Sequence, residues 1–398
     1  MDLKNKSTYI FILENINYFF AILISFLIPF HKNIPELTVL WLPFLICEII
    51  IAKTPLIEKK YRYPLYFMIA YFLYISLELP LFGFDEIEIR QIEIKTGFLV
   101  FPIICLFAGT KIKSNINKIF FSYFFGFFIV SSYKLITKGF IQKTTYSTFV
   151  GGNPTWFSLY ALLAISVSFY LYFKYKKLLL LLILADIVFI VSIFYAASRA
   201  GLITLIIIFS FEYYVLIKKN RNIAFRILSI IILLLIITFS LTNNRLKNTS
   251  LKSARIYLNL NGLKVLKENI NKPKLFLFGL GAKETTNQFR KELLNETRLP
   301  KLYRETLDTS HNDFLTIFIK RGLIGFLLFV TIVFLPLIHS IKKKDILMFS
   351  FIVIMTTNFL LNDIFVIRIG TYFFAFFYSL LSLNLLNSHQ NLEIKQLK

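Results

Sequence analysis

The chain has 398 residues, 57% of them apolar, and its mean hydropathy of +0.67 excludes an ordinary soluble domain. A net charge of +23 would suggest nucleic-acid binding in a soluble protein, but most Lys and Arg residues form short clusters between apolar runs. That pattern orients membrane proteins, so we expect membrane lipids as partners and no nucleic acid.

Apolar runs of about 17 to 25 residues, which are long enough to cross a bilayer, recur along the chain. The first run, from about Tyr9 to Phe30, has no small-residue cleavage site and is interpreted as a retained anchor. We predict an all-α polytopic membrane protein with about twelve transmembrane helices, the second and fourth of them short. The runs are centred near residues 20, 44, 73, 102, 127, 164, 187, 208, 232, 327, 353 and 375.

The loops between the runs predict the orientation. If the N-terminus is cytoplasmic, every even-numbered loop is cytoplasmic too, and each of these loops is short and basic, as the positive-inside rule requires. We therefore expect both termini in the cytoplasm. The basic residues of these loops are Lys53, Lys59, Lys60, Arg62, Lys111, Lys113, Lys118, Lys174, Lys176, Lys177, Lys218, Lys219, Arg221, Lys342, Lys343 and Lys344.

One long polar segment, residues 243–312, lies between the ninth and tenth spans and is expected on the outer face. It belongs to a single integral membrane domain of residues 1–398, and its many basic residues would attract anions such as diphosphates or acidic glycans. An unliganded, solvated surface is the alternative. Helical spacing predicts a helix from Ser253 to Asn269, which Lys272-Pro273 ends, and Gly279-Leu280-Gly281 predicts a tight turn. Two further short helices are expected, over Thr285–Asn295 and Leu302–Leu307.

His311 closes this segment and precedes a hydrophobic span. A histidine at the membrane–water boundary can stay hydrated and exchange protons near neutral pH, which makes it the candidate general base. The alternative is a helix-start residue with a hydrogen-bonded ring. The other histidines lie at span ends or in the tail, as His31, His339 and His389.

Three arginines are expected on the same outer face as His311. Arg199 lies between spans seven and eight, Arg255 opens the long segment, and Arg368 follows the turn between the last two spans. The planar guanidinium of arginine can bind two phosphate oxygens at once. Three arginines and a histidine on one face therefore predict a site for a phosphorylated substrate. The alternatives are interfacial snorkelling for Arg199, a surface position for Arg255, and a simple pair with Asp363 for Arg368.

Other chemistries find little support in the sequence. No acidic cluster has metal-ligand spacing, no glycine loop would bind phosphate, and Cys47 and Cys105 fall inside apolar runs. We expect no metal and no cofactor. Asp186 and Glu212 are acids within spans seven and eight, where inter-helix hydrogen bonds or a proton path would both explain them.

From Gly151 to Leu381 the chain resembles the bacterial O-antigen ligases, within the wider superfamily that includes Wzy-type polymerases. The parts that carry the resemblance stand in the family's order and are Ser198-Arg199-Ala200-Gly201, Ser253-Ala254-Arg255-Ile256-Tyr257, Gly279-Leu280-Gly281, His311-Asn312, Gly322 with Gly325, and Asp363 with Arg368. One departure is Lys320, at a position where many relatives carry a glutamate; it puts a carboxylate-assisted role there in doubt. The residues before Gly151 carry no motif of the family.

The resemblance implies a GT-C-like fold and a metal-independent, inverting glycosyl transfer at the periplasmic face of the bacterial inner membrane. The donor would be an undecaprenyl-diphosphate-linked glycan and the acceptor a sugar hydroxyl of lipid A–core. In that scheme His311 acts as general base, and Asn312 and Asp313 orient the ring or bind sugar. Three arginines stabilise the diphosphate: Arg199, Arg255 and Arg368.

Two other functions stay open at this point. A Wzy-type polysaccharide polymerase would use the same donor with a second lipid-linked glycan as acceptor, and acceptor choice depends on loop shape. A lipid-linked glycan transporter or flippase would suit the many spans and basic residues. Such transporters often show internal repeats and broken helices near the midplane, and this sequence shows neither clearly.

Overall fold

The computed structural model describes residues 3–30, 34–52, 59–107, 110–137, 154–174, 179–196, 199–217, 250–295 and 310–396. These residues form helices and turns, and no strand occurs within the described ranges. The predicted all-α fold class is therefore confirmed for this part of the chain.

Eleven of the predicted spans coincide with helices, and the one near residue 232 lies outside the described residues. The helices are α1 (Leu3–Leu27), α2 (Ile34–Ala52), α3 (Lys59–Ser76), α6 (Gly97–Leu106), α8 (Ile116–Lys134), α10 (Pro154–Lys174), α11 (Leu179–Ala196), α12 (Arg199–Ile217), α18 (Asp313–Lys343), α19 (Ile346–Leu361) and α20 (Arg368–Gln396).

Length and composition qualify six helices of the described part to cross a membrane, which supports a multi-pass membrane protein. They are Ser7–Phe30, Ile34–Ala52, Arg62–Phe82, Ile116–Thr137, Thr155–Tyr172 and Asp313–Lys343. Three further apolar helices are shorter: Leu180–Phe194, Ala200–Glu212 and Ile346–Leu361. The count of about twelve spans stays a prediction.

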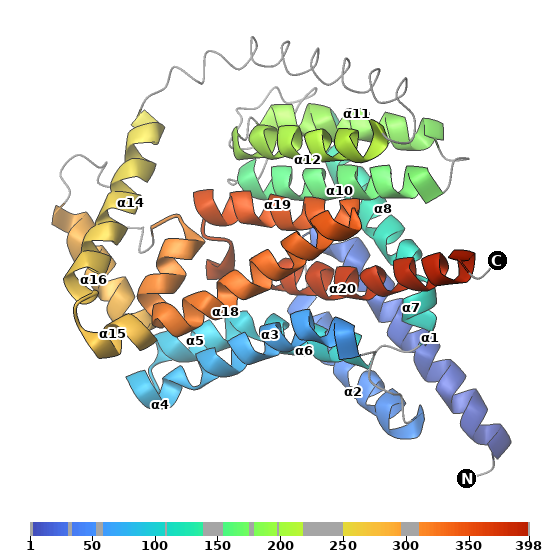
Figure 1. Cartoon of the computed structure of the whole chain (residues 1–398), viewed down its shortest axis with the longest axis horizontal. Coiled ribbons are helices and arrows are strands. Elements are labelled where there is room, and N and C mark those ends of the chain that lie inside the picture. Colours follow the sequence, from blue (N-terminus) through green and yellow to red (C-terminus); the bar gives the residue numbers. More distant parts are fainter. Residues whose placement is uncertain are drawn as a thin grey trace.

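Helix α10 is the centre of the bundle, packed against α8, α11, α12 and α19 (Figure 1). Its span is 83% buried, against 22% for the span of α1. Serine can be buried in α10 because its hydroxyl bonds to the helix's own backbone. Ser158 donates to the carbonyl oxygen of Thr155, and Ser166 donates to that of Leu162.

The long polar segment forms α14 (Ser250–Asn269), α15 (Pro273–Phe278) and α16 (Ala282–Asn295), which confirms the helices predicted over 253–269 and 285–295 and the break before Pro273. The helix predicted over 302–307 lies outside the described residues. Figure 1 shows α14–α16 at one end of the molecule and both chain termini at the other. Which end faces the cytoplasm stays a prediction.

The acidic stretch before Lys95 contains two short helices, α4 (Glu78–Phe82) and α5 (Glu86–Lys95). Asp85 starts α5, because its side chain accepts a hydrogen bond from Ile87 N at 3.0 Å and caps the first turn. Helix α5 packs against α16 and α20, so this stretch is part of the outer end rather than a free connection.

Helix α18 is interrupted at Gly322, which has φ +61° and ψ −165°. The break releases two carbonyl oxygens, and the predicted glycine turn uses them: Leu280 N donates to Ile319 O at 2.9 Å and Gly281 N to Lys320 O at 3.0 Å. A Cβ on Gly322 would lie 2.4 Å from the Leu277 carbonyl oxygen. Glycine is therefore required where the turn meets the broken helix.

Candidate active site

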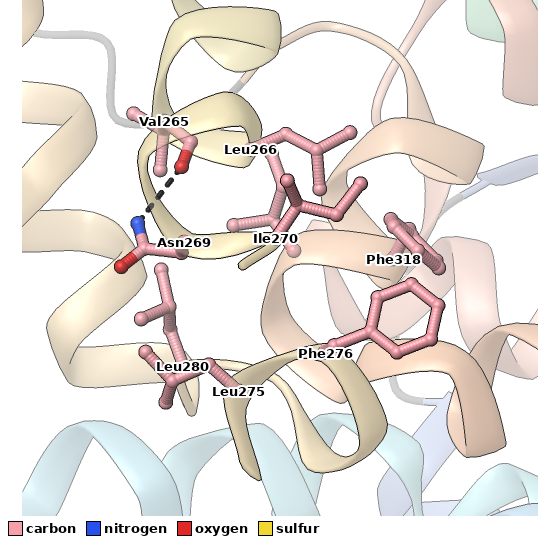
Figure 2. Close-up of a pocket in the computed structure, with 9 residues that line it drawn as sticks. Val265, Leu266, Asn269, Ile270, Leu275, Phe276, Leu280 and Phe318 are labelled. Carbon is pink, nitrogen blue, oxygen red and sulfur yellow. Dashed lines mark hydrogen bonds between the residues drawn. The ribbon is translucent and has the colours of Figure 1, made fainter. Parts of the chain in front are cut away.

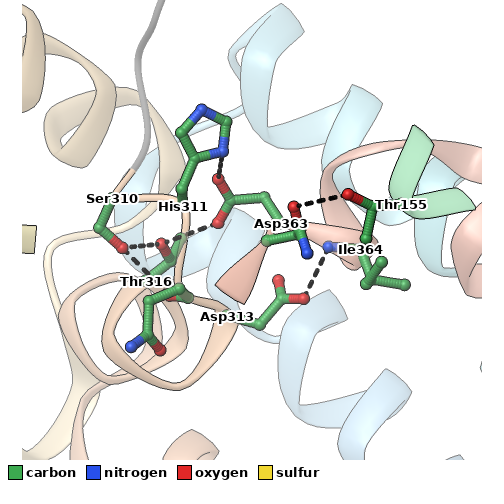
Figure 3. A network of polar contacts seen from close by, with 9 residues as sticks. Thr155, Ser310, His311, Asp313, Thr316, Asp363 and Ile364 are labelled. Carbon is green, nitrogen blue, oxygen red and sulfur yellow. Dashed lines mark hydrogen bonds and ion pairs between the residues drawn. The ribbon is translucent and has the colours of Figure 1, made fainter. Parts of the chain in front are cut away.

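A histidine and an aspartate meet just before the start of α18 (Figure 3). His311 Nδ1 lies 3.2 Å from Asp363 Oδ2, and the two side chains are 32% and 6% exposed. A carboxylate only accepts hydrogen bonds, so Nδ1 carries the proton of this contact and the lone pair of the neutral ring lies on Nε2. Figure 3 shows that second nitrogen directed away from Asp363.

The sequence around His311 fixes the ring's position. Asn312 ends the turn and starts the helix, because its Oδ1 accepts a hydrogen bond from Leu315 N at 3.1 Å. His311 itself has φ +54°, a left-handed conformation that is uncommon for residues other than glycine. Such backbone strain is characteristic of functional sites, where surrounding contacts maintain it.

The second oxygen of Asp363 is also engaged. Thr316 Oγ1 donates to Asp363 Oδ1 at 3.4 Å, and Ser310 Oγ lies 2.8 Å from Thr316 Oγ1. Thr316 and Ser310 are both buried. The carboxylate of Asp363 is therefore held on both sides, which fixes the direction of its bond to His311.

Beneath this pair, the short helix η4 (Ile364–Val366) is held by two charged side chains. Asp313 Oδ2 accepts a hydrogen bond from Ile364 N at 2.7 Å. Lys95 Nζ donates to the Phe365 carbonyl oxygen and lies 5.0 Å from the Phe365 ring centroid. Burial lowers the pKa of Lys95 to about 7, while the nearby Asp313 and Asp363 act in the opposite direction.

At the break in α18, Arg321 pairs with Glu78 of α4, and the two side chains are 4% and 2% exposed. Tyr74 Oη donates to the Arg321 carbonyl oxygen at 2.7 Å. Arg321 is thus neutralised inside the protein and is not available to a substrate. Lys320, the residue at the position where many relatives carry a glutamate, is itself buried.

The same acidic stretch also holds helix α16. Glu88 Oε1 accepts hydrogen bonds from Ala282 N at 2.6 Å and Lys283 N at 3.0 Å, so a buried carboxylate caps the positive end of that helix. Asp85 Oδ2 pairs with Lys283 Nζ at 2.8 Å on the surface. The hydrogen bond between them lowers the pKa of Asp85 and raises that of Lys283.

The predicted site residues are brought together only in part. Arg368 Nη2 lies 3.2 Å from Glu93 Oε2 on the exposed rim, so its partner is Glu93, while Asp363 faces His311. Arg199 begins α12 and Arg255 lies in α14, but the structure describes only their backbone and not their side chains. Their roles stay predictions.

The hollow between α14, α15 and α18 is a different feature (Figure 2). Its lining is apolar apart from Asn269, whose amide nitrogen donates to Val265 O at 2.8 Å and to Gln288 Oε1 at 2.8 Å. It has no titratable lining residue and no role in proton transfer. Across the described ranges, no three His, Cys, Asp or Glu side chains gather closely enough to hold a metal ion.

Sequence reasoning considered Asp313 as a residue that orients the ring of His311 or binds sugar, but it assigned no role to three positions that build this end of the molecule: Glu78, Glu88 and Lys95. All three precede Gly151, where no motif was recognised. The available signal was charge complementarity, since residues 78–93 are rich in acids and the segment 243–312 is rich in bases.

A family model described as O-antigen ligase matches residues 184–330, which confirms the predicted resemblance. The family indicates a ligase- or polymerase-type glycosyltransferase activity and, with the apolar helices, a multi-pass membrane protein whose partners are lipid-linked glycans and membrane lipids. No curated protein matches the chain. His311 falls inside the matched region, whereas Lys95 and Asp363 fall outside it.

Proposed function

We propose that this chain, whose residues 184–330 match the O-antigen ligase family, transfers a glycan from undecaprenyl diphosphate to a sugar hydroxyl of lipid A–core. The reaction would occur at the periplasmic face of the inner membrane, without cofactor or metal. The observation that best supports it is the His311–Asp363 contact of 3.2 Å, which leaves Nε2 of a partly exposed imidazole available as a proton acceptor.

In the proposed reaction, the acceptor hydroxyl gives its proton to His311 Nε2 while its oxygen attacks the anomeric carbon of the donor. The bond from that carbon to the diphosphate oxygen breaks, and undecaprenyl diphosphate leaves with the bonding electron pair. A single displacement inverts the anomeric centre. Asp363 stabilises the imidazolium that forms and keeps the ring in the tautomer that can accept a proton.

The diphosphate gains charge as it leaves, and we assign its stabilisation to Arg199 and Arg255, with Arg368 in support. Arg368 fits a supporting role because its pair with Glu93 is solvent-exposed, at 43% and 57%, so an anionic headgroup can compete for the guanidinium. The side-chain oxygen Oδ1 of Asn312 caps the helix, which leaves the side-chain nitrogen Nδ2 to donate to a sugar or phosphate oxygen.

The test is transfer in proteoliposomes that contain purified protein, undecaprenyl-diphosphate glycan and lipid A–core. We expect glycan on the acceptor with wild type, and a rate about 10²–10⁴-fold lower with His311→Ala. His339→Ala is the matched control, because His339 lies near the far end of α18, the helix whose start His311 precedes. Chelator should leave the wild-type rate unchanged.

The products separate the possible functions. Glycan on lipid A–core supports the ligase, whereas longer lipid-linked donor chains would assign the protein to the polymerases instead. The absence of any new glycosidic bond under both conditions would contradict the proposal and favour a transporter. A His311→Ala protein that no longer inserts or binds donor would assign the histidine a structural role.

A further inference from the structure

Two charged side chains from different parts of the chain form hydrogen bonds to the backbone of the segment that carries Asp363. Asp313, at the start of α18, accepts from the backbone nitrogen of Ile364 at 2.7 Å. Lys95, at the end of α5, donates to the backbone carbonyl of Phe365, which is 270 positions away in sequence. Both bonds hold the backbone directly after Asp363, so they control where that carboxylate points.

Lys95 and Asp313 are 5% and 1% exposed, and each lies within the other's electrostatic field. The other charged groups facing them are Lys320 of α18 and Asp363 itself. Removing one partner of a buried charge pair leaves the other uncompensated, which is far more costly than removing both. An apolar pair of similar size would serve stability at least as well, so stability alone is a weak explanation for these charges.

We propose that Lys95 and Asp313 are positioning residues that together clamp the Ile364–Val366 turn and thereby hold Asp363 against His311. They touch neither the acceptor nor the donor. Their effect on transfer rests on the proposed function, but their effect on the ring of His311 does not. The N-terminal part of the chain, which lies outside the matched family region, then supplies a residue on which the geometry of the reacting pair depends.

Two single variants and their combination test the clamp. Asp313→Leu removes the oxygen that accepts from Ile364 N and keeps a side chain of similar size, and Lys95→Met keeps the side-chain length and removes the donor to Phe365. We expect each single variant to lower kcat by about 10- to 10²-fold with little change in KM, because displacement of Asp363 misplaces the base without touching substrate contacts. The double variant should lose less than the product of the two single losses.

The decisive readout does not need activity. In protein labelled with ¹⁵N at histidine, the His311 signal is identified by its absence in His311→Ala. Wild type should keep the proton on Nδ1 of the neutral ring, as the contact with Asp363 requires. Both single variants should shift the neutral ring toward the tautomer protonated on Nε2, and the acid limb of their pH–rate profiles should move to lower pH.

Two matched controls exist in the same chain. Lys111 is also a lysine bonded to a neighbour and set over aromatic rings, with Asn15 as acceptor and Phe11 beneath it. Asp345 is a half-buried aspartate at a helix start, where it caps α19 by accepting from Met348 N at 2.9 Å. Lys111→Met and Asp345→Leu should leave the His311 signal and kcat unchanged.

An unchanged His311 tautomer in both single variants, measured on protein that elutes as wild type does, would overturn the proposal. So would equal shifts in the controls, since these would reflect general loosening of the bundle. If wild type itself transfers no glycan, the proposed function fails, while the tautomer measurement still decides whether the clamp exists.

Discussion

Two buried polar clusters of this protein differ in a way that separates scaffold from chemistry. Between α1 and α2, Asn17 donates to Glu48, and Trp41 Nε1 donates to Asn17 Oδ1 at 2.9 Å. Just before α18, His311 and Asp363 meet at 3.2 Å, with Asp313 and Lys95 beneath them. The first cluster joins two consecutive helices; the second gathers side chains from α5, α18 and the turn before α20.

The more telling difference is exposure. Asn17, Trp41 and Glu48 are each at most 1% exposed, so no solute can reach them. His311 is 32% exposed, although its partner Asp363 is 6% exposed. A buried carboxylate that orients a reachable imidazole can pass a proton to and from a ligand, whereas a fully enclosed network can only hold helices together.

Among variants that keep His311, the largest effect should come from removing the charge of Asp363, which orients the ring. Asp363→Asn keeps the shape of the side chain but offers His311 an amide, which allows the ring to adopt the wrong tautomer. We expect transfer to fall about 10²-fold at an unchanged amount of folded protein. The measurement is the proteoliposome transfer rate at saturating donor.

The combination with His311→Ala sharpens this prediction. Because the two side chains act as a unit, the double variant should be no slower than His311→Ala alone. Multiplicative losses would mean that Asp363 acts independently of the histidine, and the contrast drawn between the two clusters would then lose its main support.

The parts of this end that the sequence predicted are those written in local patterns. A helix beginning after Asn312, a turn at Gly279-Leu280-Gly281 and a break before Pro273 each depend on neighbouring residues, and all are confirmed. The described spans were predicted to be helices for a similar reason. An apolar run in lipid must hydrogen-bond its own backbone groups, and a helix does so within one segment.

The contacts between distant segments could not be predicted in that way. Lys95 and Phe365 are 270 positions apart, and nothing in either local pattern selects the other. Asp363 was considered as a partner for Arg368, since both lie at one turn, yet Arg368 pairs with Glu93 and Asp363 with His311. Which carboxylate faces which cation depends on how α5 packs against α16, α20 and η4, and that packing is a property of the whole bundle.

The second prediction concerns pH. Burial lowers the pKa of Lys95 to about 7, well below the ordinary value that the residue has in the unfolded chain. Between about pH 7 and 10 the unfolded chain therefore binds more protons, and stability rises with pH through this window by up to about 1.4 kcal/mol per unit. Below pH 7 the cost of burying the charge is fully present.

The comparison that isolates this effect is wild type against Lys95→Met, by thermal unfolding in detergent at pH 6.5, 7.5 and 8.5. We expect the unfolding midpoint of wild type to rise relative to that of the variant across the series. Parallel curves would mean that Lys95 keeps its charge in the folded protein throughout, held by Asp313.

A smaller effect on stability and transfer is expected at the start of α16, where Glu88 makes a buried contact and Asp85 an exposed one. Glu88→Gln weakens the cap on α16 and should cost about 1–2 kcal/mol of stability with a few-fold loss of transfer. Asp85→Asn breaks a surface pair with Lys283 and should change little, most of it suppressed by salt. Thermal unfolding at low and high salt measures both, and equal costs would contradict the assigned burial.

The smallest effect on transfer should come from the enclosed cluster. Asn17→Leu removes the partner of both Glu48 and Trp41 and leaves their polar groups buried and unpaired, at a cost of about 1–3 kcal/mol. The unfolding midpoint should therefore fall clearly. Helix α1 packs against α2, α7 (Thr110–Ser114) and α8, away from His311, so the rate per folded molecule should stay within about twofold of wild type. A variant that unfolds easily but transfers normally would establish that the two clusters do different work, because loss of stability and loss of chemistry would then be separable in one chain.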